Sequence, residues 1–423
     1  MKIETKCIQS GYDPKNGEPR VIPINMSTTF KYTSTQEVGD LFDLKADGYF
    51  YTRLANPTVG YVESKLADLE GGVGAMMTSS GQAASLISIL NIASVGDHVI
   101  ASTDIYGGTV NLLGVTLKKM GIEVEFVKVN DLCALEKAIR PNTKAVFAET
   151  IANPALTVLD IEGVSSVAHK HGIPLIVDNT FATPYLCRPF EFGADIVTHS
   201  SSKYLDGHAT ALGGFIVDGG KFDWVKSGRF DCLTEKDESY HGLSYTETFG
   251  NQAYIVKARV QLMRDLGSSP SPMNAFLCNL GMETLHLRME RHSSNALAVA
   301  KFLESDHRVK KVVYPGLEKD ERHGLCNKYL KDGKCSGVIT FELHSYEEAV
   351  RFMDSLKLAA IVVHVADART GVLHPASSTH RQLTAQQLID CGISEGTIRL
   401  SVGIENVDDI IADVAQALDK INA

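Results

Sequence analysis

The chain has 423 residues, of which 44% are hydrophobic and 22% are charged, and this composition excludes a disordered chain, a collagen and a small disulfide scaffold. Its net charge of −10, from 41 lysines and arginines against 51 aspartates and glutamates, argues against nucleic acid and anionic membranes as partners. The length suggests two or three domains, or one large α/β domain with an appendage.

Residues 1–60 are predicted to be irregular, because they carry several prolines and show little helical periodicity. An irregular segment of this length is unusual inside a compact domain. Residues 21–24 and 49–51 are too apolar for a disordered tail. We therefore expect an arm that packs on a neighbouring subunit.

From residue 61 to about 220, helical and strand-like segments alternate. Helices are predicted over 61–70, 81–93, 111–120, 132–139 and 164–171, and strands over 75–78, 98–101, 124–129, 145–148, 174–178, 196–198 and 213–217. The strands are nearly continuous runs of apolar residues, as in buried parallel strands. This alternation predicts an α/β fold with a mainly parallel central sheet covered on both faces.

The remainder of the chain is predicted to hold an insert and a second, smaller α/β unit. Residues 222–275 are polar and are read as a loop region leading into a helix at 253–264. The second unit is expected to contain a long helix at 281–303, strands at 309–314, 337–343 and 360–365, and a terminal helix at 408–421. The predicted domains are an N-terminal arm, 1–60, a large domain, 61–275, with an insert at about 222–256, and a small C-terminal domain, 276–423.

The cysteines and the pattern of apolar residues indicate in which cell compartment the protein is expected. None of the eight cysteines forms a C-x-x-C pair, so we expect isolated, reduced thiols. Residues 1–6 lack the apolar core of a signal peptide, and no stretch approaches about 18 apolar residues. These features lead us to expect a cytoplasmic protein that does not span a membrane.

Unusual polar residues follow the ends of several predicted strands, where open parallel sheets bind ligands. Asp178 ends one strand, and Lys203 follows the next. Glu149 and Asn153 follow another, and residues 79–81 follow the first. Each has a simpler interpretation, as a turn residue, a helix cap or an exposed lysine, but together they describe one chemistry.

That chemistry is the binding of pyridoxal phosphate. A buried lysine such as Lys203 can form a Schiff base with the cofactor aldehyde. The carboxylate of Asp178 suits the pyridine nitrogen, and Tyr106 can lie on the ring. The phosphate requires N–H donors at a helix N-terminus together with hydroxyls, and these are available at Ser80, Gly81, Gln82, Ser200 and Ser202.

Several motifs for other chemistries are missing from the sequence. It has no phosphate-binding G-x-x-x-x-G-K-[ST] loop. No G-x-G-x-x-G opens a helix, which argues against a dinucleotide-dependent oxidoreductase. His169 and His171 point in different directions on a helix, so no metal site is expected.

Six segments carry a resemblance to a known family. They are YTRLANPT at 51–58, YGG at 106–108, VDNTF at 177–181, HSSSKY at 199–204, GIS at 392–394 and IRLSVGIE at 398–405. In this order they resemble the pyridoxal-phosphate enzymes of cysteine and methionine metabolism, the cystathionine γ-synthase-like family. The resemblance implies the type I fold of pyridoxal-phosphate-dependent transferases, which is aspartate-aminotransferase-like.

Within the family, residues 240–250 and 258–267 resemble the sulfhydrylases that act on O-acetylhomoserine, whereas HPASSTH at 374–380 is shared more widely. This implies a γ-replacement with sulfide or a thiol, giving homocysteine or methionine and acetate, in methionine biosynthesis. Methionine γ-lyase and cystathionine γ-synthase activities remain alternatives, although methionine γ-lyases typically have cysteine where Gly108 stands. A non-catalytic homologue is disfavoured by the intact set of site residues.

The resemblance also implies residue roles. Lys203 would bind the cofactor covalently and shuttle protons, Asp178 would pair with the pyridine nitrogen, and Tyr106 would stack on the ring and take part in catalysis. The phosphate would be bound by Ser80, Gly81, Gln82, Ser200 and Ser202. Asn153 would lie over the cofactor hydroxyl.

Further implied roles concern the substrate and a second subunit. Arg399 would bind the substrate carboxylate, and His364 stands where relatives usually carry serine or asparagine near that carboxylate. Tyr51 and Arg53 would reach the phosphate of a neighbouring subunit, with Tyr51 also near the substrate. The implied assembly is a homo-oligomer, a tetramer made as a dimer of dimers, with shared active sites.

Overall fold

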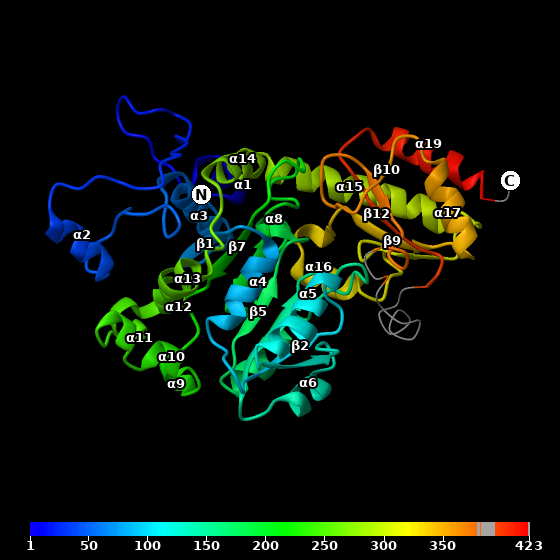
Figure 1. Cartoon of the computed structure of the whole chain (residues 1–423). Helices are drawn as coiled ribbons and strands as arrows, with labels where there is room; N and C mark the ends of the chain where they lie inside the picture. Colours follow the sequence, from blue (N-terminus) through cyan, green and yellow to red (C-terminus); the bar gives the residue numbers. More distant parts are fainter. Residues whose placement is uncertain (379–380, 382–393, 422–423) are drawn as a thin grey trace.

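A computed structural model describes residues 1–378, 381 and 394–421. The GIS segment at 392–394 lies outside them except for Ser394, as do Cys391 and the last two residues of the 374–380 motif. The polypeptide builds two sheets, one of seven strands and one of five. In Figure 1 the second sheet lies at the orange and red end, and the blue N-terminal segment with α2 projects at the opposite end.

The seven-stranded sheet has the order β1-β7-β6-β5-β4-β2-β3. Its strands are β1 Gly74–Thr78, β2 His98–Ser102, β3 Glu123–Val127, β4 Thr143–Glu149, β5 Leu175–Asp178, β6 Ile196–Ser200 and β7 Gly214–Asp218. Only β7 is antiparallel to its neighbours, and the other pairs are parallel. The predicted mainly parallel sheet is therefore confirmed.

Both faces of the inner part of this sheet are buried because its inner strands are mostly apolar. In β5, Val177 belongs to one hydrophobic cluster and Ile176, pointing the other way, to a second. Helices α3 Pro57–Glu70, α4 Gly81–Leu90, α6 Leu132–Ala138 and α7 Ile161–Lys170 lie where helices were predicted. The helix predicted at 111–120 begins earlier, as α5 Gly107–Asn111, and continues as a π-helix over Leu112–Leu117.

The five-stranded sheet has the order β10-β11-β12-β9-β8. Its strands are β8 Lys311–Val313, β9 Val338–Glu342, β10 Ala360–Ile361, β11 Gly371–Leu373 and β12 Thr397–Ser401. Helices α16 His323–Tyr329, α17 Tyr346–Ser355 and α19 Val407–Leu418 accompany it, with α17 packed against α19. The strand predicted over 360–365 has only two residues, and β11, β12, α16 and α17 were not predicted.

The long helix predicted over 281–303 is in fact two helices, α14 Pro272–Glu283 and α15 Leu285–Ser305. Thr284 separates them with φ −103° and ψ 6°, outside the helical region. No glycine or proline marks this break, so the sequence carried no signal for it.

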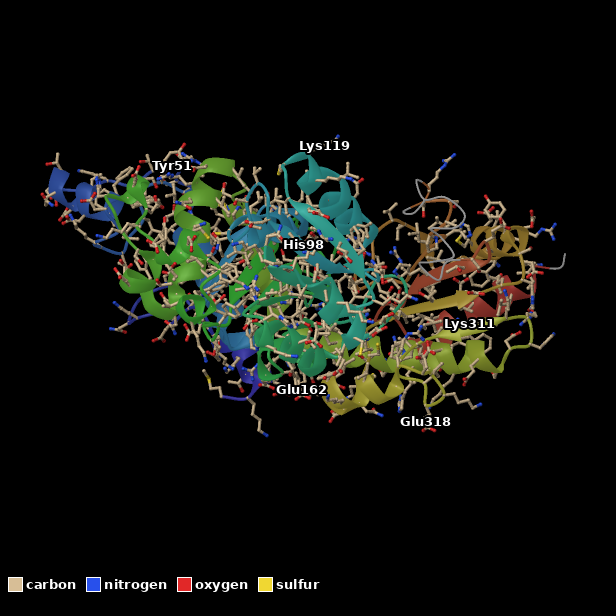
Figure 2. All side chains as sticks on the ribbon, turned by 90° about the horizontal axis from the view of Figure 1, so that it is seen from below. Tyr51, His98, Lys119, Glu162, Lys311 and Glu318 are labelled. Atoms are coloured by element: carbon tan, nitrogen blue, oxygen red, sulfur yellow. The ribbon has the colours of Figure 1, made fainter. Side chains whose placement is uncertain are left out.

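The N-terminal arm is not wholly irregular, which corrects the prediction for residues 1–60. It contains α1 Ile3–Gln9 and α2 Thr35–Phe42, and α2 begins with a capping box between Ser34 and Glu37. Both helices are short, so their apolar pattern covers too few turns to be recognised. Tyr51 lies at the arm's end of the molecule, and Lys311 of the second sheet lies toward the other end (Figure 2).

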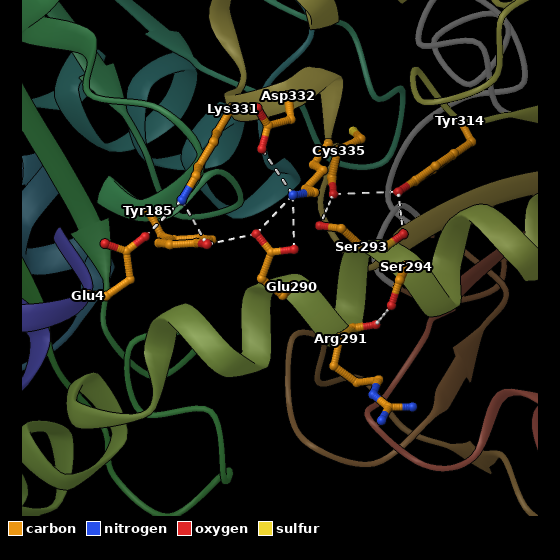
Figure 3. Close-up of polar contacts among 11 residues, drawn as sticks. Glu4, Tyr185, Glu290, Arg291, Ser293, Ser294, Tyr314, Lys331, Asp332 and Cys335 are labelled. Atoms are coloured by element: carbon orange, nitrogen blue, oxygen red, sulfur yellow. Dashed lines mark hydrogen bonds and ion pairs between the residues drawn. The ribbon is translucent and has the colours of Figure 1, made fainter. Parts of the chain in front are cut away.

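A polar network ties the first helix to the start of the second unit. Lys331 Nζ contacts Glu4 Oε1 at 3.1 Å and the Tyr185 hydroxyl at 2.8 Å, and that hydroxyl donates to Glu290 Oε1 at 2.7 Å (Figure 3). The network joins α1, α8 Thr183–Leu186 and α15. Exposed ion pairs of this kind are individually weak.

The predicted insert is partly helical rather than a plain loop. It holds α9 Trp224–Ser227, α10 Asp231–Thr234 and α11 Tyr245–Phe249, followed by α12 Ala253–Lys257, a π-helix over Ala258–Met263 and α13 Arg264–Leu266. The Trp224 ring stacks on the Tyr254 ring at 5.4 Å. Among the helices in the described ranges, none combines the length and the apolar character that crossing a membrane requires. The boundaries at residues 60 and 275 stay predictions.

Candidate active site

A cavity of about 540 Å³ opens where the carboxyl ends of β4, β5 and β6 meet residues from the second sheet. Eleven of the thirteen predicted site residues line it: Ser80, Gly81, Gln82, Tyr106, Asn153, Asp178, Ser200, Ser202, Lys203, His364 and Arg399. They come from segments up to about 320 residues apart in the sequence. The fold therefore brings these side chains to one place.

Lys203 lies in the turn after β6, and its side chain is mostly enclosed. Its Nζ lies 3.2 Å from Nδ1 of His364. Burial and the positive charge of Arg399 lower the pKa of Lys203 to about 8. A lysine with such a pKa loses its proton easily and can act as a nucleophile or a base near neutral pH.

Asp178 ends β5 at the floor of the cavity. Its Oδ1 accepts the Thr180 N–H at 2.9 Å and also the Thr180 hydroxyl. Burial raises the pKa of Asp178 above its usual value, because a buried charge lacks the solvation of water. A protonated ring nitrogen placed here would offset that loss.

The N-terminus of α4 forms another wall. Ser80 caps the helix by accepting the Ala83 N–H at 3.2 Å. A Cβ at Gly81 would lie 2.6 Å from the Ser200 Cβ, so only glycine fits this close approach. In the described part of the chain, the buried Gln82 Oε1 has no hydrogen-bond partner. Free N–H groups, hydroxyls and the NH₂ group of the Gln82 side chain are donors that suit a phosphate, whose oxygens accept hydrogen bonds.

Arg399, from β12, is the cation on the second unit's side of the cavity, and it is only 3% exposed. Its Nη1 donates to Asn153 Oδ1 and its Nη2 to the Val363 carbonyl, both at 3.2 Å. Nε is buried and has no partner among the described residues. Burial lowers the pKa of Arg399 to about 10, partly opposed by Tyr106. A carboxylate ligand would satisfy this guanidinium.

Tyr51 and Arg53 are the two predicted site residues that lie elsewhere. They line a second cavity, of about 780 Å³, between the arm and the insert. The Arg53 guanidinium lies 5.3 Å from the Tyr51 ring centre and donates to the Arg264 carbonyl. Within one chain, these residues are therefore not brought to Lys203.

Sequence reasoning gave no role to two residues of the cavity, Thr180 and Glu149. Thr180 holds Asp178 and also accepts the Ser200 N–H at 2.9 Å. Its position two residues after an aspartate that ends a strand is a signal for a turn of this kind. Glu149 was noticed as a strand-terminal polar residue, but its partners come from the three-dimensional fold. The described ranges contain no cluster of His, Cys, Asp and Glu able to hold a metal ion.

The fold and this cavity define a class of protein, the enzymes that carry pyridoxal phosphate on a lysine at the edge of a mainly parallel sheet. The chain belongs to the family described as Cys/Met metabolism PLP-dependent enzyme, whose sequence profile matches residues 4–419. It is therefore a pyridoxal-phosphate-dependent enzyme, which confirms the predicted family and cofactor.

Named relatives cover nearly the whole chain. An O-acetyl-L-homoserine sulfhydrylase of Leptospira meyeri is 45% identical over 100% of this chain and 97% of its own length. A homocysteine synthase of Schizosaccharomyces pombe is 45% identical over 99% of this chain and 98% of its own.

A solved structure is similar over its full length. It is the crystal structure of a Campylobacter jejuni protein assigned as an O-acetylhomoserine (thiol)-lyase, which contains a pyridoxyl-lysine phosphate. The TM-score is 0.97 at 39% identity, covering 99% of this chain and 100% of that one. This likeness confirms the predicted fold class.

Proposed function

We propose that this enzyme replaces the acetate group of O-acetyl-L-homoserine with sulfide, giving L-homocysteine and acetate, or methionine when a thiol is the donor. The full-length similarity to sulfhydrylases and homocysteine synthases supports this substrate. The observation that carries the proposal is the cavity in which Lys203, Asp178 and Arg399 lie together.

The arrangement of the cavity residues supports the proposed cofactor contacts. Asp178 is placed to pair with the pyridine nitrogen, and Tyr106 to lie against the ring. We expect the phosphate to bind at the N-terminus of α4, where the hydroxyls of Ser80, Ser200 and Ser202 lie close by. Asn153 is placed beside the cofactor hydroxyl.

The chain's own residues then handle the substrate and its protons. When bound, pyridoxal phosphate delocalises the negative charge left on the substrate as a C–H bond breaks. Arg399 binds the substrate carboxylate, with His364 next to it. The amine of Lys203 removes a proton from Cα and then one from Cβ, and the electrons of the Cβ–H bond expel acetate from Cγ, where Tyr106 is positioned to protonate it. Sulfide then adds at Cγ to form the new Cγ–S bond, and protons return to Cβ and Cα to complete homocysteine.

Reactivity of Lys203 in the cofactor-free chain should rise as the pH rises through about 8, because burial and Arg399 lower its pKa to that value. Lys203 is protonated and unreactive below this pH and a free amine above it. Arg399→Gln should move the midpoint of the Lys203 titration to higher pH, because it removes the positive charge that helps to lower the pKa of Lys203. Acetic anhydride labelling followed by peptide mass spectrometry measures this midpoint, and one that Arg399→Gln leaves in place would contradict the assignment.

We propose that Tyr51 and Arg53 complete the cavity of a neighbouring subunit, within a homotetramer built as a dimer of dimers. Two observations support the sharing of cavities between subunits. The arm that carries them extends away from the first sheet (Figure 1), and both residues are remote from the cavity of their own chain. Light scattering should give a mass four times that of the 45.9 kDa chain.

Arg53→Ala should weaken cofactor binding, since it removes a charged contact to phosphate. Co-expressing Arg53→Ala chains with Lys203→Ala chains should restore activity, because one site then has Lys203 from one chain and Arg53 from the other. The matched control pairs Lys203→Ala with Asp178→Asn, two residues of the same cavity, and should show no rescue. Equal activity of the two mixtures would contradict shared sites.

A γ-lyase or a cystathionine γ-synthase remains the second candidate. A Cβ at position 108 would lie 2.5 Å from the Tyr106 ring, so the cysteine found in methionine γ-lyases would displace that ring. This close approach favours the sulfhydrylase. Incubation with O-acetylhomoserine and ³⁴S-labelled sulfide should yield labelled homocysteine. Faster release of 2-oxobutanoate from methionine, or faster use of cysteine as donor, would favour the second candidate.

We also propose that the enzyme works in the cytoplasm. The cysteines of the described residues are free thiols, and such thiols persist in reducing compartments.

A further inference from the structure

Glu149 is a buried carboxyl group at the wall of the cavity, and the proposed mechanism does not use it. Its Oε1 accepts the backbone N–H of Tyr106 at 2.7 Å, and its Oε2 accepts the backbone N–H of Asn153 at 3.2 Å. Tyr106 follows β2, whereas Asn153 follows β4, which ends at Glu149 itself. One side chain therefore joins the loops at the ends of two neighbouring strands.

Both residues held in this way present side chains to the cavity. Tyr106 is 41% exposed and lines it. Asn153 lines it as well and accepts a hydrogen bond from Nη1 of Arg399 at 3.2 Å. The contacts thus run from Glu149 through Asn153 to the arginine proposed to bind the substrate.

The surroundings of Glu149 make its burial costly. It is 8% exposed, and its register partner across the β4–β5 pair is another carboxyl group, Asp178. Burial and the charge of Asp178 raise the pKa of Glu149, with a smaller contribution from Asp104. Among the described residues, no lysine, arginine or histidine forms an ion pair with Glu149. Its two bonds to backbone N–H groups are the favourable interactions that set its position.

We propose that Glu149 is a positioning residue that fixes Tyr106 against the cofactor ring and Asn153 beside Arg399. This deepens, and rests on, the function proposed above. Glu149 acts through the two backbone N–H groups and not by contact with substrate.

The direct test is Glu149→Gln. A glutamine has one acceptor oxygen and an NH₂ donor, so it cannot accept both N–H groups with separate oxygens and leaves one buried donor unsatisfied. We expect about a tenfold weaker affinity for pyridoxal phosphate, measured by absorbance titration, and a changed visible circular dichroism of the bound cofactor. The matched control is Glu342→Gln, the last residue of β9, which should leave both unchanged.

A double-mutant cycle separates positioning from general destabilisation. In a chain that already has Tyr106→Ala and Asn153→Ala, Glu149→Gln should weaken cofactor binding less than about twofold, because the side chains it positions are gone. The same tenfold loss in both backgrounds would overturn the proposal, as would an unchanged affinity in the single variant.

A measurement on the unaltered chain keeps the proposal testable if Glu149→Gln does not fold. Hydrogen exchange should show protected amides at Tyr106 and Asn153, and exchange at the rates of an open loop would overturn the proposal. Failure of the unaltered chain to take up pyridoxal phosphate would instead contradict the proposed function.

Discussion

Lys203→Ala is expected to lose turnover by about 10⁴-fold or more, since the variant lacks both the attachment point of the cofactor and the base that moves the substrate proton. The lysine is suited to both tasks because burial and Arg399 lower its pKa to about 8. No other lysine lines the cavity within the described residues. The steady-state rate of homocysteine formation and the visible absorbance of the purified protein measure the two losses.

The control for this variant is Lys119→Ala, which removes an exposed lysine that does not line the cavity. It should keep full activity and normal absorbance. A Lys203→Ala chain that turns over at an appreciable fraction of the original rate would show that the assignment of Lys203 is wrong.

The second large effect is expected at Arg399. Arg399→Ala should lower kcat/KM by about 10²- to 10⁴-fold, because two hydrogen bonds between a guanidinium and a carboxylate are each worth roughly 1.5–3 kcal/mol. Most of the loss should appear in KM, since the contact is present in the bound substrate as well as in the transition state. Steady-state kinetics with O-acetylhomoserine measures how the loss is divided between kcat and KM.

Arg399→Lys provides the informative comparison at the same position. It keeps the charge but loses the planar fork that holds Asn153 Oδ1 and the Val363 carbonyl. We expect it to recover little of the lost kcat/KM. Full recovery would mean that charge alone is sufficient and that bidentate binding is not used.

The sequence predicted the first sheet well, because its strands are apolar runs separated by helices with clear periodicity. The rule that ligands bind at the carboxyl ends of parallel strands located Asp178, Lys203 and Asn153 without any resemblance. The second sheet was harder to predict. Strands such as β11, with three residues, are too short for a periodic pattern.

Contacts between distant segments were beyond the reach of sequence patterns. The 3.2 Å approach of Lys203 to His364 joins residues 161 positions apart, and only the family resemblance suggested that both belong to one site. The role inferred for Glu149 depends on two backbone N–H groups, which no side-chain pattern reveals. The helix break at Thr284 likewise has no local signal.

The most direct test of the account is to reduce the purified enzyme with borohydride, which fixes the cofactor permanently to the amine that carries it, and then to map the peptides by mass spectrometry. The account predicts that the added pyridoxyl phosphate mass lies on Lys203 alone. The same mass on another lysine, or on no peptide after reduction of a protein saturated with pyridoxal phosphate, would contradict it.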